Sequence, residues 1–338
     1  MPGMARHSLL LSLFIATSAF AQPQITSVTP ASGPVTGGTT VIIRGSGFDT
    51  SSSVSFAGVA ALSVRLIDSG TLETVTPANF PGSATVTVVK PNGAAFLRDA
   101  FTYTGEISDA FERVLLPIFA TPVSGSFGSQ FYTFFSIWNI AGPDIPVFAF
   151  APFPCSFLCP PPPPGPFPIV LKARQGAPAS LFQFDGNPGR IVFIPKGAFD
   201  RLAASLRVAD LSRSNESFGT RIPIVFEREF RSDFLALIDV PMTSKFRNTL
   251  RIYSLDPQTS VHIRVIRYDS TKIHSEFDVD LRDPVDMFHP SYAEVSQFGN
   301  VPSDNVRIEI EPRSGKRIWA FDSVTNNDTQ QITVVAPR

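Results

Sequence analysis

Apolar and polar side chains alternate over many short segments of this chain. Val54 and Phe56 alternate with serines, and residues 84–89 place threonines on one face and valines on the other. A period of two is typical of a β-strand with one buried face. Turn signals such as Gly33-Pro34 and Pro91-Asn92-Gly93 separate the segments, because glycine adopts positive φ and proline fixes φ. The pattern predicts an all-β protein.

The turns of the first β-rich region, residues 24–104, carry an ordered set of motifs. They are Pro30 with Ser32-Gly33-Pro34, Gly37-Gly38-Thr39, Gly45-Ser46-Gly47-Phe48, Phe56-Ala57-Gly58, Thr76-Pro77-Ala78, Pro81-Gly82, Pro91-Asn92-Gly93 and Phe101-Thr102-Tyr103. On these motifs, residues 25–104 resemble the IPT/TIG domain, which has an immunoglobulin-like fold. Ala57 stands where a second glycine is common in that family. The resemblance implies a β-sandwich that acts as a spacer or a binding module, and it implies no catalytic residues.

The segment 1–21 has the features of a secretory signal peptide. Arg6 and His7 precede an apolar run at residues 9–15, and Ala19-Phe20-Ala21 is a suitable cleavage site. A membrane anchor is the alternative, but the apolar run is shorter than the roughly 20 residues that a spanning helix needs. We therefore expect an exported protein, secreted or on the cell surface, with no membrane span once the signal is removed.

Strand-like segments continue to the end of the chain. We expect two further β-sandwiches, at residues 110–240 and 241–338, with a proline-rich insert at 151–168 in the first. One large sandwich that carries the insert is the alternative. This part of the chain resembles uncharacterised secreted bacterial proteins, and that resemblance implies no function.

A faint internal repeat favours two sandwiches over one. Residues 135–140 match residues 250–255 in character, and residues 206–208 match residues 306–308. Because both matches occur in the same order, we interpret the two regions as related units in tandem.

The two cysteines, Cys155 and Cys159, lie within the proline-rich insert. In an oxidising compartment this pair most simply forms a disulfide that closes a small loop. A metal site would need further ligands nearby, and the insert contains none.

Composition limits the classes of partner. Charged residues make up 17% of the chain and the formal net charge is −1, so electrostatics does not favour nucleic acid or an anionic membrane. The many phenylalanines are expected to fill cores first. The aromatic residues proposed as platforms for sugar rings are Trp138, Trp319, Tyr132 and Tyr292.

The sequence contains no recognisable constellation for catalysis or metal binding. His262, His274 and His289 have no metal-ligand spacing, and we expect them at the surface or at rims. Asp278 and Asp280 alternate with apolar residues, which is typical of a strand with one solvated face, and Asp283 and Asp286 follow them. Calcium binding by these four acids is the alternative. We expect no catalytic residue, no metal and no cofactor.

These observations favour a non-catalytic exported protein of stacked β-sandwiches, with a role in binding, adhesion or surface structure. The partner would be an unknown protein or glycan at the cell surface. A carbohydrate-binding surface protein is the first alternative. A hydrolase acting on polysaccharide or peptide is the second, and it would need two carboxylates, or a serine or histidine dyad, in one cleft.

Overall fold

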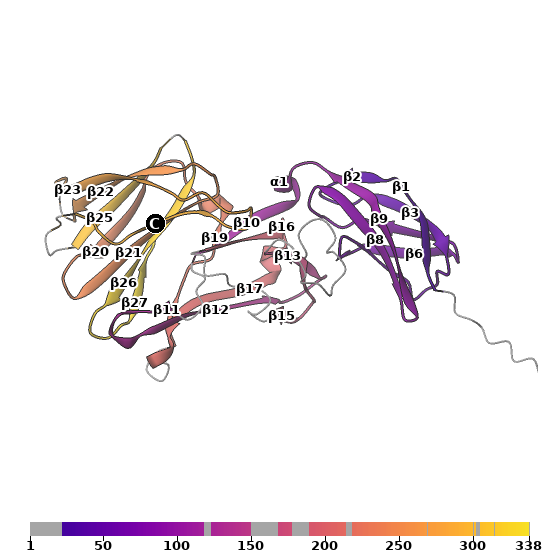
Figure 1. Ribbon diagram of the computed structural model, residues 1–338, viewed down its shortest axis with the longest axis horizontal. Coiled ribbons are helices and arrows are strands. Elements are labelled where there is room, and N and C mark those ends of the chain that lie inside the picture. Colours follow the sequence, from indigo (N-terminus) through magenta and orange to yellow (C-terminus); the bar gives the residue numbers. More distant parts are fainter. Residues whose placement is uncertain are drawn as a thin grey trace, which may run out of the picture.

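The computed structural model describes residues 22–117, 123–149, 168–177, 189–213, 218–268, 270–299, 301, 305–313 and 315–337. In this part of the chain, the strands form six sheets that pair into three units arranged in a row (Figure 1). The prediction of an all-β protein built from sandwiches is confirmed. The signal segment 1–21, both cysteines and residues 151–167 of the insert lie outside the described residues, so the predictions for them remain untested.

The first unit packs a four-stranded sheet against a five-stranded sheet. In spatial order, the four-stranded sheet contains β1 (Gln24–Thr29), β3 (Thr40–Ser46), β7 (Thr71–Val75) and β6 (Ser63–Asp68). The five-stranded sheet contains β2 (Ser32–Pro34), β9 (Gly93–Thr104), β8 (Gly82–Lys90), β4 (Ser53–Phe56) and β5 (Val59–Ala60). Ile43 and Leu72 from one sheet and Phe56 and Phe101 from the other are fully buried. Each such side chain contributes about 1.5–3 kcal/mol of burial free energy.

The middle unit follows the short helix α1 (Ile107–Ala110). Its first sheet contains β14 (Pro168–Leu171), β13 (Ile145–Phe148), β16 (Arg190–Pro195), β10 (Phe111–Leu116) and β19 (Val225–Phe226) in spatial order. Its second sheet contains β11 (Val123–Ser124), β12 (Gln130–Asn139), β17 (Leu202–Asp210) and β18 (Thr220–Arg221), and β15 (Gln175–Ala177) also pairs with β12. Short 3₁₀ turns at Ser126–Gly128, Phe199–Arg201, Leu211–Arg213 and Glu227–Glu229 connect or flank these strands.

The last unit contains two four-stranded sheets. The first contains, in spatial order, β20 (Leu235–Pro241), β25 (Asn305–Pro312), β22 (Ser260–Arg267) and β23 (Ile273–Asp280). The second contains β24 (Ser291–Val295), β21 (Phe246–Ser254), β26 (Ile318–Asn326) and β27 (Ile332–Val335). Strand β20 pairs with β25. The last sandwich therefore begins with β20, at Leu235, and not at 241 as expected, because a strand belongs to the sheet with which it forms hydrogen bonds.

The middle and last units share one strand order. Strands β14-β13-β16-β10 correspond to β23-β22-β25-β20, and β12-β17-β18 correspond to β21-β26-β27. Strand β15 pairs with β12 as β24 pairs with β21. Residues 135–140 and 250–255 of the sequence repeat begin in the equivalent strands β12 and β21. The match between 206–208 and 306–308 is wrong, because these segments lie in β17 and β25, which are not equivalent.

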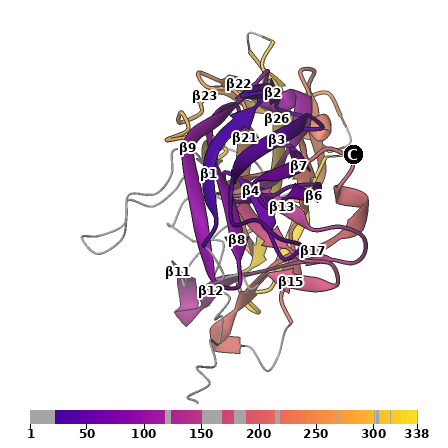
Figure 2. The same cartoon turned by 90° about the vertical axis from the view of Figure 1, so that its right-hand side faces the viewer.

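Aromatic and charged contacts join the three units. The ring of Phe80 in the first unit lies 5.1, 4.6 and 5.2 Å from the rings of Phe111, Phe148 and Phe193 in the middle unit. Phe193 in turn lies 5.5 Å from Phe288 of the last unit. The units therefore share buried surface, and Figure 2 shows the first unit in front of the other two along one axis.

Candidate functional site

Strand β12 carries aromatic side chains on both faces. Phe135 and Ile137 point into the middle sandwich and are buried. The alternate residues Tyr132, Phe134 and Trp138 point outward, and 49% of Trp138 is exposed. The outward face of a two-layer sandwich is normally polar, so an aromatic row at this position needs a reason beyond the fold.

The residues paired with Trp138 on the two neighbouring strands are small. It is paired with Gly176 of β15 on one side and with Ala203 of β17 on the other. A Cβ atom at Gly176 would lie 2.7 Å from a carbon of the indole ring, a distance that real Cβ atoms essentially never show. Glycine at this position therefore lets the indole lie against the backbone of β15, while half of its surface stays open.

A second aromatic group lies four residues earlier on the same face. The guanidinium carbon of Arg207 lies 3.8 Å from the ring centroid of Phe134 and 4.0 Å from that of Phe218. Phe218 is 75% exposed, and its backbone carbonyl accepts a hydrogen bond from Arg207. Tyr132 contacts Phe134 edge to face, with centroids 4.9 Å apart. The guanidinium thus makes cation–π contacts with both phenylalanine rings.

Small hydroxyl side chains separate the two aromatic groups. Ser136 of β12 is paired with Ser205 of β17, and both point outward. Because a strand rises about 3.3 Å per residue, Phe134 and Trp138 are about 13 Å apart along β12. We call this surface the open face. It consists of Tyr132, Phe134, Ser136, Trp138, Gly176, Ala203, Ser205, Arg207, Phe218 and Arg221.

The equivalent face of the last unit is covered by protein. Tyr253 corresponds to Trp138, and its cross-strand partner Trp319 corresponds to Ala203. Tyr253 is 0% exposed and its hydroxyl donates to the carbonyl oxygen of Pro117 of the middle unit at 3.3 Å. Trp319 is 5% exposed and packs on Phe321. The prediction of Trp319 as a sugar platform is therefore wrong, because its ring is buried and packs on Tyr253 and Phe321.

Tyr292 lies next to a cavity at the junction of the units. Its ring is half-buried against Tyr253, and its hydroxyl donates to Glu294 at 2.6 Å. Burial raises the pKa of Tyr292. The recess it lines also contains Arg282 and His289. One edge of the ring is thus accessible, but the ring is fixed by protein on its other side.

A larger cavity of about 340 Å³ adjoins this recess and is lined by residues of the middle and last units and of the link before α1. His289, expected at the surface or at a rim, is 9% exposed there, and its Nδ1 lies 2.6 Å from a carboxyl oxygen of Asp286. Glu227 accepts two hydrogen bonds from Arg113, at 2.9 and 2.6 Å, and one from Arg317 at 2.9 Å. Hydrogen bonds from Arg113, against an opposing desolvation cost, hold the pKa of Glu227 at about 2. Because the carboxylate of Glu227 is hydrogen-bonded to two arginines, it joins the units and is poorly suited to donate a proton.

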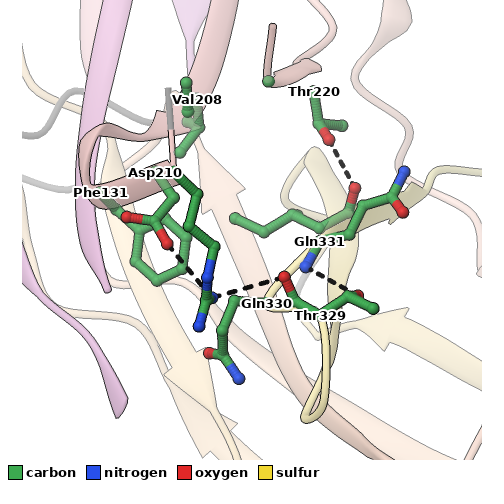
Figure 3. A pocket seen from close by; sticks show the side chains of 11 residues that line it. Phe131, Val208, Asp210, Thr220, Thr329, Gln330 and Gln331 are labelled. Carbon is green, nitrogen blue, oxygen red and sulfur yellow. Dashed lines mark hydrogen bonds and ion pairs between the residues drawn. The ribbon is translucent and has the colours of Figure 1, made fainter. Parts of the chain in front are cut away.

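Figure 3 shows a third recess, of about 180 Å³, between the middle unit and the turn that joins β26 to β27. Arg213 lies 3.5 Å from Asp210 and donates to the carbonyl oxygen of Thr329 at 3.4 Å. Thr220 donates to the carbonyl oxygen of Ile332. Most polar groups in the recess therefore have partners, and these contacts attach β27 to the middle unit.

The four acids considered for calcium do not converge. Asp278 contacts His262 at 2.7 Å and Arg313 at 3.3 Å, whereas Asp283 accepts from the backbone of Gln258. Asp286 faces His289 instead. Among the described residues, no group of three or more His, Cys, Asp or Glu side chains is placed to hold a metal ion. No helix in this part of the chain has the length and apolar character to cross a membrane.

Sequence reasoning identified Trp138 and Tyr132 but missed Phe134, Arg207 and Phe218. The signal for Phe134 was present, because period-two alternation in residues 130–139 places it on the same face as Tyr132 and Trp138. Arg207 and Phe218 come from other strands and loops, and only the register of β12 with β17 brings Arg207 to Phe134.

Comparisons with known proteins agree with part of this structure. Residues 23–104 match the IPT/TIG domain model, which confirms the resemblance inferred from the turns. No curated protein matches the sequence.

Several solved structures show weak likeness. The γ-CGTase of an alkalophilic Bacillus clarkii is 18% identical over 62% of this chain and 25% of its own length, with a TM-score of 0.23. A structural genomics protein of unknown function from Bacteroides thetaiotaomicron is 14% identical over 93% of this chain and 60% of its own length, with a TM-score of 0.23. The protein SGBP-B, from a xyloglucan utilization locus of Bacteroides uniformis, is 12% identical over 94% of this chain and 100% of its own length, with a TM-score of 0.22. Because none of these scores indicates a shared overall fold, only the residues of this chain bear on its function.

Proposed function

We propose that this chain, with its IPT/TIG domain at residues 23–104, is a non-catalytic carbohydrate-binding protein, secreted or held at the cell surface. It binds its glycan on the open face of the middle unit. One observation carries the proposal. The aromatic outward face of this repeated sheet is covered by protein in the last unit and is open in the middle unit, where Trp138 is 49% exposed.

The chemistry of the open face suits a polysaccharide. The C–H groups on one face of a pyranose ring carry partial positive charge and stack on the negative face of an indole. Ser136 and Ser205 present hydroxyl groups that exchange hydrogen bonds with sugar hydroxyls. The separation of about 13 Å between Phe134 and Trp138 leaves room for more than one sugar ring. A glycan chain would therefore lie across the sheet, with one ring on Trp138.

The same features explain why a glycan is favoured over an adhesive protein partner. In the last unit, where a protein covers this face, the positions equivalent to Ala203 and Ser205 hold the large rings of Trp319 and Phe321. On the open face, the positions next to Trp138 instead hold the small side chains of Ala203, Ser136 and Ser205. Such a surface matches the alternating apolar faces and hydroxyl edges of sugars.

The experiment is a binding screen of the exported chain on soluble and insoluble polysaccharides, with Trp138→Ala as the test variant. We expect saturable binding that this substitution weakens by about fivefold to tenfold, because stacking on an exposed ring contributes on the order of 1–1.5 kcal/mol. Phe96→Ala removes a ring that is 66% exposed in the first unit, and it is the matched control. Equal binding by the wild type and Trp138→Ala would contradict the proposal.

A further inference from the structure

We propose that the polysaccharide bound on the open face is anionic and that its charges are uronic acid carboxylates. This inference rests on the proposed function and narrows its ligand. It comes from the charged side chains of the face. Among the outward positions that the register defines on β12, β15, β17 and β18, the charged residues are Arg207 and Arg221, and no carboxylate is among them.

The two arginines lie directly opposite each other. Arg207 of β17 is the cross-strand partner of Arg221 of β18, and Arg221 is exposed. Like charges in this arrangement repel and destabilise the pair of strands. Neither guanidinium forms an ion pair with any residue that the structure describes; Arg207 instead contacts the rings of Phe134 and Phe218. Among the described residues, the face thus carries positive charge without an acidic partner, and an anionic ligand would neutralise this charge.

In the last unit, an outward arginine on the equivalent strand has an acidic partner. Arg251 points outward from β21, the equivalent of β12, and it is paired with Glu294 at 2.8 Å. It also donates to Ser323 at 2.5 Å. The sheet therefore neutralises an outward arginine where protein covers it, whereas the two arginines of the open face have no acidic partner in the part of the chain that the structure describes.

The stacking of Arg207 favours a carboxylate as the anion. The rings of Phe134 and Phe218 both lie against its guanidinium, with their centroids 3.8 and 4.0 Å from the guanidinium carbon. The remaining N–H groups therefore point in the plane of the guanidinium, and one of them is used by the carbonyl of Phe218. A planar fork of N–H donors matches the two oxygens of a carboxylate.

The position of this fork fits a ligand chain that also uses Trp138. Arg207 is paired with Phe134, which precedes Trp138 by four residues, about 13 Å along the strand. A sugar ring on the indole would place its neighbours in the chain over Ser136 and Ser205, toward the two arginines. A carboxylate on such a neighbouring ring is the group that the fork would bind.

The test compares two forms of one polymer. Polygalacturonate in its de-esterified form carries a carboxylate on each ring, and full methyl esterification removes the charge while the backbone stays the same. We expect the exported chain to bind the de-esterified form about tenfold more tightly at low salt, and we expect high salt to reduce this difference. Arg221→Gln should weaken binding of the de-esterified form by about threefold to fivefold and should weaken binding of the esterified form less.

Trp138→Ala separates failure of this inference from failure of the proposed function. If both forms bind equally, Arg221→Gln has no effect and Trp138→Ala weakens both, the ligand is a neutral glycan and only the charge inference is overturned. If neither form, nor a neutral β-glucan, shows binding that depends on Trp138, the proposed function fails with it. Binding to vesicles of anionic phospholipid that Trp138→Ala leaves unchanged would also overturn the inference, because charge alone would then explain the affinity.

Discussion

Trp138 in the middle unit and Tyr253 in the last unit occupy equivalent positions of one repeated sheet, yet they are 49% and 0% exposed. Around Tyr253 the neighbouring outward positions hold Trp319 and Phe321, and around Trp138 they hold Ala203 and Ser205. The exposed aromatic face is therefore not a property of the repeat itself. In one copy this face carries large rings and is a packing surface, and in the other the exposed ring of Trp138 has small side chains beside it.

The two units also differ in where they leave charge unpaired. On the solvated sheet of the last unit, Arg264 and Arg307 are paired with Glu309, whereas Arg207 and Arg221 of the middle unit lack acidic partners among the described residues. The last unit instead contains an isolated acid in its core. Asp322 is 0% exposed, and its cross-strand partners are Leu250 and Val335. The middle unit thus has two arginines without acidic partners among the described residues on its surface, and the last unit has a buried carboxyl group in its core.

We expect the largest effect from Asp322→Asn, because this substitution removes the carboxyl group that is buried in the last unit. Burial raises the pKa of Asp322 to about 7, against opposing effects of Arg251 and the backbone of Thr249. In the unfolded chain the pKa is about 3.9, so the folded state binds the extra proton between these values and loses stability as pH rises through them. The wild type should therefore lose on the order of 3 kcal/mol relative to Asp322→Asn between about pH 4 and pH 8.

Urea denaturation of both proteins across this pH range measures the difference. Asp328→Asn changes an exposed acid in the next turn and is the control, for which we expect no comparable trend. A constant difference between the wild type and Asp322→Asn at all pH values would show that the buried carboxyl does not titrate in this range.

Ser205→Glu would give the open face the acid that it lacks. Ser205 lies two residues before Arg207 on the same face of β17, so a glutamate there is within reach of the guanidinium. We expect binding of the de-esterified polygalacturonate to fall about tenfold, because the new carboxylate competes for Arg207 and repels the ligand. Isothermal titration measures this, and Ser205→Gln separates charge from size. An equal loss with glutamine would mean that the side chain merely blocks the face.

Gly176→Ala tests whether glycan binding depends on the position of the Trp138 ring against β15. The added Cβ would meet the ring of Trp138 at 2.7 Å and the carbonyl oxygen of Ile137 at 3.2 Å, so the ring must shift. We expect glycan binding to weaken by about fivefold, with a change in tryptophan fluorescence, since a stacking platform depends on its orientation. In the background of Trp138→Ala the same substitution should add nothing further. An additive loss would place the effect elsewhere in β15.

The smallest effect is expected from Glu309→Gln on the solvated sheet of the last unit. This substitution leaves Arg264 and Arg307 without the partner that lies 3.5 and 2.9 Å away. The free energy of unfolding should fall by less than about 1 kcal/mol, and high salt should reduce the loss, since exposed ion pairs contribute little and are screened. Chemical denaturation at two salt concentrations measures this. Glu276→Gln, whose carboxylate contacts only His262 at 3.5 Å among the described residues, should have a smaller effect still.

Local patterns in the sequence were enough to predict the strands and the IPT/TIG unit. The turns of residues 24–104 depend on glycine and proline at fixed positions, so they are readable without tertiary information. The two tryptophans show the limit. Trp138 and Trp319 both lie in strands with aromatic neighbours, and only the packing of the last unit on the middle unit decides that one is open and the other is core. The start of the last sandwich was placed too late for the same reason, since β20 finds its partner β25 about 70 residues further along the chain.

The ring of Phe80, which the first unit inserts among Phe111, Phe148 and Phe193 of the middle unit, affects how a glycan can be reached. A flexible linker would let each molecule turn its binding surface toward a nearby chain. An aromatic joint of this kind instead fixes the angle between the IPT/TIG unit and the surface that carries Trp138. Molecules tethered side by side by their first units would therefore present their platforms in parallel, and avidity for a long polymer would depend on the spacing of the tethers and not on the flexibility of the chain.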